Sequence, residues 1–303
     1  MKHLVNTFTV LLLLITGTVA TSANYEIKKK YVPTVKDLEG VSEKLIELES
    51  NELSTINDIK DYIKQVENLA ETYHQGTISM SKEKKALEVL YDVEKYADET
   101  KAYGSTRDMM ECGFLHTAAF HYKTALNSKE LLGQIDLPVV NAVTNEIEAW
   151  LKLENTLNEY YAYSSFLHNQ GGSMAGIAAS GSAWRLAEAR YNDTEQLLKA
   201  GFARGARDFP MQNDIKKKAN DIVNSFITTA KDLLDCDKDF KKSAYYKEVS
   251  KSMTEACQNL KTVMDTWVNK RLAMIACFED QSIGISETFK LLDNIKKIGE
   301  LEK

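Results

Sequence analysis

Three side chains that often bind metal ions lie close together in the sequence: Cys112, His116 and His121. On a helix, Cys112 and His116 are one turn apart and share a face. His121 is nine residues from Cys112 and turns to the opposite face. Zinc is normally held by three or four converging ligands. Because only two converge here, the sequence predicts no metal site and favours a structural cysteine beside ordinary polar histidines.

No pattern in the chain predicts catalysis. The metalloprotease H-E-x-x-H, the C-x-x-C and the dinucleotide-binding glycine motifs are absent. Carboxylates such as Glu146 and Glu148 are two residues apart, so they diverge on a helix, and a solvated helix face explains them. His74, His116, His121 and His168 are too few and too scattered to indicate a catalytic set. We therefore expect no catalytic residue, no cofactor and no enzyme activity.

The segment 173–183 is rich in glycine and alanine. It is not a phosphate loop or a hydrolase elbow, because Gly-Lys-Ser/Thr and Gly-x-Ser-x-Gly are both absent. Small residues let two backbones approach closely, or they form a flexible loop before Trp184. Both interpretations give this segment a structural role.

Four basic clusters are spread along the chain: Lys28 to Lys30, Lys216 to Lys218, Lys241-Lys242 and Lys296-Lys297. Together they could bind a sulfated glycosaminoglycan or an anionic membrane surface. Acidic residues flank every cluster, so solvated helix faces are the simpler interpretation. The formal net charge of −6 also gives the chain no bulk attraction for nucleic acid.

Residues 1–23 have the pattern of a signal peptide. Lys2 and His3 precede the apolar run Val10 to Ile15, and small residues follow up to Ala23, where we expect cleavage, with Ala20 as the alternative site. The run is too short for a permanent anchor, and no later stretch reaches the ~20 apolar residues that a membrane span needs. The sequence therefore predicts a secreted, soluble chain.

Export determines how the four cysteines are interpreted. In an oxidising compartment Cys112, Cys236, Cys257 and Cys277 are expected to form two disulfides. Four cysteines allow three connectivities, which the sequence does not separate. The favoured arrangement has one bridge within the C-terminal three and one from them to Cys112. The single sequon, Asn192-Asp-Thr194, is a candidate glycosylation site on an exposed helix or loop.

Composition and periodicity predict an all-α fold. The chain has only three prolines, 44% hydrophobic and 27% charged residues, and long apolar stripes with steps of three and four. The stripes between Pro210 and Cys277 are the clearest, and a heptad-like stripe from Thr34 to Gly76 predicts a long first helix with a shift near Glu52. We expect an elongated antiparallel bundle of about seven or eight helices, stapled by disulfides. Residues 24–303 form a single helical region in this interpretation, or two subdomains, 24–132 and 133–303.

The layout of the chain resembles a known family. A leader that ends in small residues, one cysteine in the first half and three in the second, an acidic balance and a mass of 34.2 kDa are similar to the 34-kilodalton salivary secreted proteins of culicine mosquitoes. The resemblance implies a non-enzymatic salivary effector. Such a protein would bind host extracellular or cell-surface molecules, modulate haemostasis or immune responses at the bite, and favour transmission of a virus in saliva. It assigns no role to any single residue.

Two other functions fit the sequence. A secreted carrier of small hydrophobic or amine ligands would need a cavity between helices, which the aromatic run Tyr160, Tyr161, Tyr163 and Phe166 could line. The alternative is that these tyrosines lie at a helix contact with their hydroxyls toward water. A structural, self-assembling protein is suggested by the heptad-like first stripe.

Overall fold

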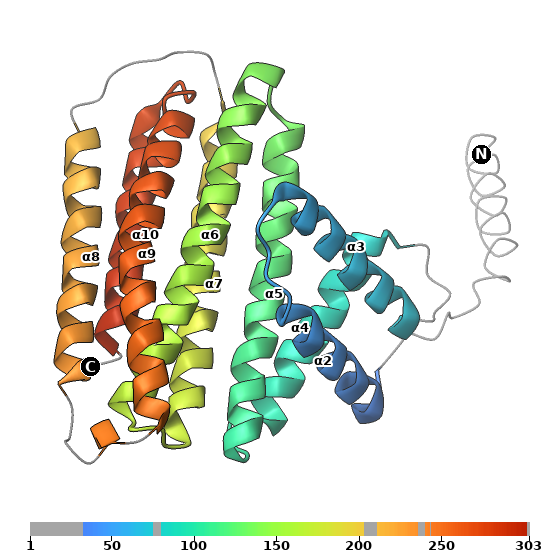
Figure 1. Cartoon of the computed structure of the whole chain (residues 1–303). Coiled ribbons are helices and arrows are strands. Elements are labelled where there is room, and N and C mark those ends of the chain that lie inside the picture. Colours follow the sequence, from blue (N-terminus) through green and yellow to red (C-terminus); the bar gives the residue numbers. More distant parts are fainter. Residues whose placement is uncertain (1–32, 75–79, 203–210, 236–239, 243, 302–303) are drawn as a thin grey trace, which may run out of the picture.

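A computed structural model describes residues 33–74, 80–202, 211–235, 240–242 and 244–301 (Figure 1). Within these ranges every regular element is helical, which confirms the all-α prediction. The predicted signal peptide, the cluster Lys28 to Lys30 and Cys236 lie outside the described residues.

Nine α-helices and one short 3-10 turn make up the described part of the chain, slightly more than the seven or eight helices predicted. They are α2 (Val35–Glu49), α3 (Ile56–Tyr73), α4 (Lys82–Thr100), α5 (Thr106–Gly133), α6 (Leu137–His168), α7 (Met174–Ala200), α8 (Gln212–Leu234), η1 (Phe240–Lys242), α9 (Ala244–Ile275) and α10 (Gln281–Leu301).

The predicted first helix is two helices, and this prediction was wrong for a local reason. Thr55 and Asp58 form a second capping box: the Asp58 carboxylate accepts the Thr55 backbone N–H at 2.7 Å, and the Thr55 side chain accepts the Asp58 N–H. This arrangement starts a new helix rather than bending the old one. The apolar stripe folds back, and Val41, Leu45 and Val66 are buried within this chain. That stripe therefore offers no open coiled-coil face.

The helices from α5 to α10 run side by side, and α2, α3 and α4 pack on one side of α5 (Figure 1). Neighbours in sequence are not always the main neighbours in space. The largest contact of α5 is with α7 rather than α6, and α6 packs mainly on α9. Several successive helices do pack on each other, such as α3 with α4, α6 with α7 and α8 with α9.

Small residues bring α5 and α7 close together, which is one of the two interpretations of the Gly- and Ala-rich segment. A Cβ atom on Gly113 would lie 2.7 Å from Ser180 Oγ, and one on Gly176 would lie 2.5 Å from Met110 Sδ. Both separations are too short for a real Cβ contact. The segment is thus part of a tightly packed helix and not a flexible loop.

The aromatic run on α6 belongs to the hydrophobic core. Tyr160 and Tyr161 are fully buried, and their hydroxyls donate to the carbonyl oxygens of Phe226 (3.1 Å) and Ile295 (3.2 Å). The Tyr160 ring also stacks on Phe226, with ring centres 4.8 Å apart. These tyrosines tie α6 to α8 and α10. The expectations that they line a ligand cavity, or that their hydroxyls face water, were wrong.

The predicted disulfides are not present among the described cysteines. Cys112, Cys257 and Cys277 are free thiols. Cys112 lies on α5, whereas Cys257 lies within α9 and Cys277 just after the end of α9. At ~1.5 Å per residue, Cys257 is about 27 Å from the last residue of α9. A disulfide needs Cα atoms within ~7 Å, so Cys257 and Cys277 cannot pair with each other. Cys257 lies inside α9 and Cys277 just after its end, so the length of the helix keeps the two apart.

No helix in the described part of the chain combines the length and the apolar content needed to cross a membrane.

Candidate functional site

A cavity of about 420 Å³ lies where the end of α2 and the start of α3 meet α5, α6 and α7. One part of its wall is apolar and aromatic, including Phe114, Ile147, Trp150 and Leu151. The remainder carries ionisable groups, among them Glu49, His121 and Glu154. An apolar wall with a few convergent polar groups is typical of a small-molecule site.

His121 is held between two carboxylates from different helices. Its Nδ1 lies 2.7 Å from Glu49 Oε2, and its Nε2 lies 3.3 Å from Glu154 Oε1. The side chains are largely buried, with exposed fractions of 19%, 8% and 7% for His121, Glu49 and Glu154. Both ring nitrogens face acceptors, so both act as donors, which requires the imidazolium form.

The charges favour that form. Burial alone lowers the pKa of His121, but attraction by Glu49 and Glu154 outweighs it and raises the pKa well above 6.5. Two carboxylates and one imidazolium leave a net charge of −1 inside the cavity. A general base needs a pKa close to the working pH, so a histidine with such a raised pKa is a poor general base near neutral pH. The arrangement is suited to binding a cation rather than to removing a proton.

Other side chains hold the two carboxylates in place. Trp150 Nε1 donates to Glu154 Oε2 at 3.1 Å, and the Tyr62 hydroxyl donates to Glu49 Oε1. Each carboxylate therefore has one oxygen on His121 and one on an aromatic donor. A carboxylate oxygen accepts more than one hydrogen bond, so both retain capacity for a ligand.

Two further acids, Glu52 and Glu159, lie at the exposed edge of the cavity. Partial burial and the nearby Glu52 charge raise the pKa of Glu159. Glu52 accepts a hydrogen bond from Asn155 Nδ2 at 2.9 Å, whereas Glu159 has no hydrogen-bond or ion-pair partner within the described ranges. The edge therefore adds negative charge, which no lysine or arginine in the described part of the chain neutralises by an ion pair.

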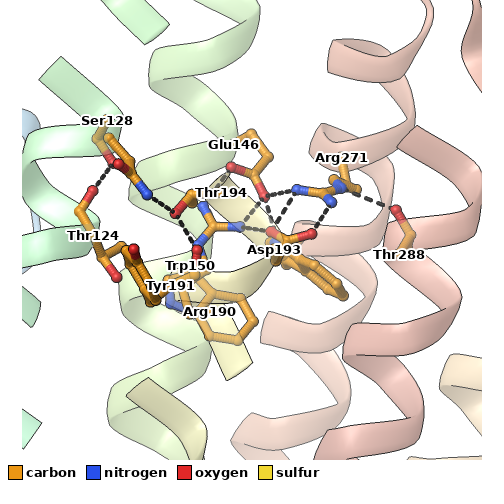
Figure 2. Close-up of polar contacts among 12 residues, drawn as sticks. Thr124, Ser128, Glu146, Trp150, Arg190, Tyr191, Asp193, Thr194, Arg271 and Thr288 are labelled. Carbon is orange, nitrogen blue, oxygen red and sulfur yellow. Dashed lines mark hydrogen bonds and ion pairs between the residues drawn. The ribbon is translucent and has the colours of Figure 1, made fainter. Parts of the chain in front are cut away.

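Arg190 connects the cavity to a buried network of charges in the core (Figure 2). Its guanidinium donates to Glu146 at 2.7 and 3.0 Å and to Asp193 at 2.8 Å. Arg271 from α9 also binds both carboxylates, and Trp267 Nε1 donates to Glu146 at 2.9 Å. Two arginines and two carboxylates balance, so this network supports the cavity floor without changing its net charge.

Glu146 does not lie on a solvated helix face, and that prediction was wrong. The residue is 1% exposed, whereas Glu148 is partly exposed and accepts the Ile56 backbone N–H at 3.2 Å. Burial alone would raise the pKa of Glu146, but attraction by Arg190 and Arg271 outweighs burial and lowers the pKa to about 2. The two carboxylates diverge, as expected, but Glu146 points into the core.

Among the described residues, three buried polar atoms on the cavity lining have no hydrogen-bond partner: Arg190 Nε, Thr124 Oγ1 and Asn158 Oδ1. Native interiors rarely leave such atoms unpaired, because the cost is roughly 1–3 kcal/mol each. Arg190 is 2% exposed, so its Nε has little access to bulk water. These atoms have almost no exposed surface, so none of them is counted among the groups that a ligand in the cavity would meet.

Comparison with protein-family models, with curated proteins and with solved structures finds no match for this chain.

The other residues singled out in the sequence lie in separate places, except for Cys112 and His116. Cys112 and His116 share one face of α5 and are joined by Asp98 from α4, whereas His121 faces the cavity. Asn192 is exposed on α7, where a glycan could be carried, although the next two residues of the sequon are buried.

The described lysine clusters have acidic partners. Lys218 pairs with Asp293 at 2.6 Å, Lys241 with Asp235 at 2.8 Å, and Lys296 lies 3.7 Å from Glu300. This pairing favours solvated helix faces over a dedicated polyanion site.

Sequence reasoning missed Arg190, Asp193, Arg271 and Glu154, although a signal existed for two of them. Arg271 falls four residues after Trp267 in the apolar stripe of α9. Glu154 likewise falls four residues after Trp150 in the stripe of α6. A charged residue at a core position of an otherwise apolar stripe indicates a buried ion that needs a partner.

Proposed function

We propose that this chain is a non-enzymatic binding protein that takes a small organic cation, an arylalkylamine in chemical class, into the cavity around His121. The observation that carries the proposal is the pair Glu49 and Glu154, which are buried beside apolar walls with only one cation between them. An ammonium group would neutralise the remaining charge, and its aromatic body would cover the apolar wall.

Geometry around the carboxylates supports this choice of ligand. An ammonium group has three donors and no acceptor, so it matches carboxylate oxygens that already hold one donor each. The unneutralised acids at the edge, Glu52 and Glu159, would draw a cation toward the opening. An anionic ligand would meet repulsion at both places.

The proposal is tested by calorimetric titration with three probes of nearly equal shape: phenethylamine, 2-phenylethanol and 3-phenylpropionate. A charge-assisted hydrogen bond contributes ~1.5–3 kcal/mol, so the amine should bind about 10 to 100 times more tightly than the alcohol. The acid should bind most weakly. Equal affinities for amine and alcohol would show that the carboxylates do not select the ligand, and the proposal would fail.

We also propose, from the resemblance described above, that the protein is secreted in saliva and modulates host haemostasis or immunity. Amine binding is one means by which a secreted protein can do this, because sequestering a small messenger requires no catalysis. A host protein partner and a glycosaminoglycan are the other ligands to test. Immunoblots of saliva and dissected tissues check the setting: strong signal in saliva supports the effector proposal, and signal confined to gut or haemolymph contradicts it.

A further inference from the structure

A second cluster of side chains joins α4 to α5; its two α5 residues flank Phe114 of the cavity wall in the sequence. It consists of Asp98 on α4 and of Cys112 and His116 on α5. One potential ligand atom from each residue lies within 4.8 Å of those from the other two. Ligand atoms around a tetrahedral zinc ion, with bonds of ~2.0–2.3 Å, are ~3.3–3.8 Å apart. Small side-chain rotations would therefore bring the three into coordinating positions.

The ring of His116 is already oriented. Its Nε2 lies 2.9 Å from Asp98 Oδ1, while its Nδ1 faces Glu94 Oε1 at 3.6 Å. Trp184 stacks on the ring with centroids 4.1 Å apart and an angle of 11°. Glu94 is itself held by Lys123 Nζ at 3.0 Å. A carboxylate behind the second nitrogen is the usual support for a metal-binding histidine.

The ligand types select the metal. A cysteine sulfur, an imidazole nitrogen and a carboxylate oxygen suit Zn²⁺, whereas Ca²⁺ and Mg²⁺ prefer oxygen ligands alone. Asp98 is exposed and the other two are buried, so solvent can reach the cluster from one side and fill a fourth position. His74 at the end of α3 offers a contrast. Its Nε2 lies 3.0 Å from the carboxylate of Glu88, which is on α4 like Asp98, but no cysteine of the described residues joins this pair.

We propose that Asp98, Cys112 and His116 bind a Zn²⁺ ion, with Glu94 as the residue that positions His116. Binding displaces the thiol proton of Cys112 and one imidazolium proton of His116 to solvent, and the ion takes their place between the three side chains. The site gives Cys112 a role that does not depend on a disulfide. It also ties α4 to α5 by bonds that hydrophobic packing alone does not provide.

The full chain, stripped with a chelator, is titrated with Co²⁺ as a spectroscopic substitute for Zn²⁺. The expected result is one Co²⁺ per chain, with a thiolate-to-cobalt charge-transfer band that disappears when Zn²⁺ is added. Cys112→Ala should abolish the band. Asp98→Asn and Glu94→Gln should weaken Zn²⁺ affinity, the latter by about 10 to 100 times.

Two matched variants serve as controls. Cys277→Ala removes another thiol, and Glu88→Gln removes the carboxylate beside His74, so neither should change the band or the affinity. If no band forms in the wild-type chain, or if Cys277→Ala rather than Cys112→Ala removes it, the site is refuted.

A second measurement needs no variant. Alkylation of the wild-type protein, mapped by peptide mass, should modify Cys112 more slowly with Zn²⁺ than without, while Cys277 is unchanged. Equal rates at Cys112 would overturn the proposal even if Cys112→Ala did not fold.

Discussion

Replacing Glu146 by Gln tests how the buried charge network supports the molecule. The carboxylate is 1% exposed and accepts four hydrogen bonds, two from Arg190, one from Arg271 and one from Trp267. Glutamine keeps the shape but removes the charge. Both arginines would then share only Asp193, and the core would hold one uncompensated positive charge.

Two routes give the size of the effect. The pKa of Glu146 is lowered from an ordinary 4.5 to about 2, which corresponds to about 3 kcal/mol of stability at neutral pH. Removing one partner of a buried ion pair typically costs ~3–5 kcal/mol. Both predict that Glu146→Gln lowers the free energy of unfolding by about 3–5 kcal/mol at pH 7.

The pH dependence follows from the direction of the shift. A carboxyl group whose pKa is lower in the folded state stabilises above its unfolded pKa, and the contribution is lost as pH falls toward the folded pKa. The difference between the wild-type chain and Glu146→Gln should therefore shrink between pH 4.5 and pH 2, to about 1–3 kcal/mol at pH 3.

Urea unfolding followed by circular dichroism, at pH 7 and at pH 3, measures this difference. Glu148→Gln is the matched control, because it makes the same chemical change two residues away on α6 and an amide oxygen can still accept the Ile56 N–H. Its cost should be below about 1 kcal/mol. A loss for Glu146→Gln no larger than that of the control, or one that stays constant from pH 7 to pH 3, would refute the reasoning.

Three other predictions concern the cavity, the helix packing and the cysteines. The variant His121→Gln should be less stable than the wild-type chain at pH 6. The difference in stability should shrink at alkaline pH, because a group with a raised folded pKa loses its contribution as pH rises through that pKa. Urea unfolding from pH 6 to pH 10 measures this difference, and a constant value would contradict the prediction. Gly113→Ala should lower the free energy of unfolding by ~1–3 kcal/mol, because its Cβ would meet Ser180. Gly133→Ala has nothing within 4 Å of its Cβ and should be neutral or slightly stabilising. Equal melting temperatures for the two variants would show that α5 and α7 are not closely packed. Alkylation in denaturant without reduction should label Cys112, Cys257 and Cys277, and protection of any of them would restore the disulfide prediction.

The helices could be predicted from the sequence because their signals are local. Thr34 and Ser81 cap α2 and α4 through hydrogen bonds to backbone N–H groups three residues on, and Asp136 precedes the first-turn proline of α6. The split after Ser50 was missed, although Thr55 and Asp58 have the spacing of a capping box. Spacing of apolar residues indicates which face is buried, but it does not show against which helix.

The candidate site depends on contacts that local patterns do not contain. Glu49 and His121 are 72 residues apart, and Glu146 and Arg271 are 125 apart. Arg271 and Glu154 lie at core positions of apolar stripes, and that anomaly was the available signal. The disulfide prediction was wrong for the described cysteines. An oxidising compartment allows disulfides to form, but two cysteines pair only if the fold brings their Cα atoms within ~7 Å.

The central claim is that buried carboxylates in the cavity select a small organic cation. Calorimetric titration of phenethylamine into the wild-type chain and into Glu154→Gln, with Glu148→Gln as the control on the same helix outside the cavity, tests it most directly. Phenethylamine should bind about 10 to 100 times more weakly to Glu154→Gln than to the wild-type chain, and equally well to Glu148→Gln. Equal affinity of the wild-type chain and Glu154→Gln would contradict it.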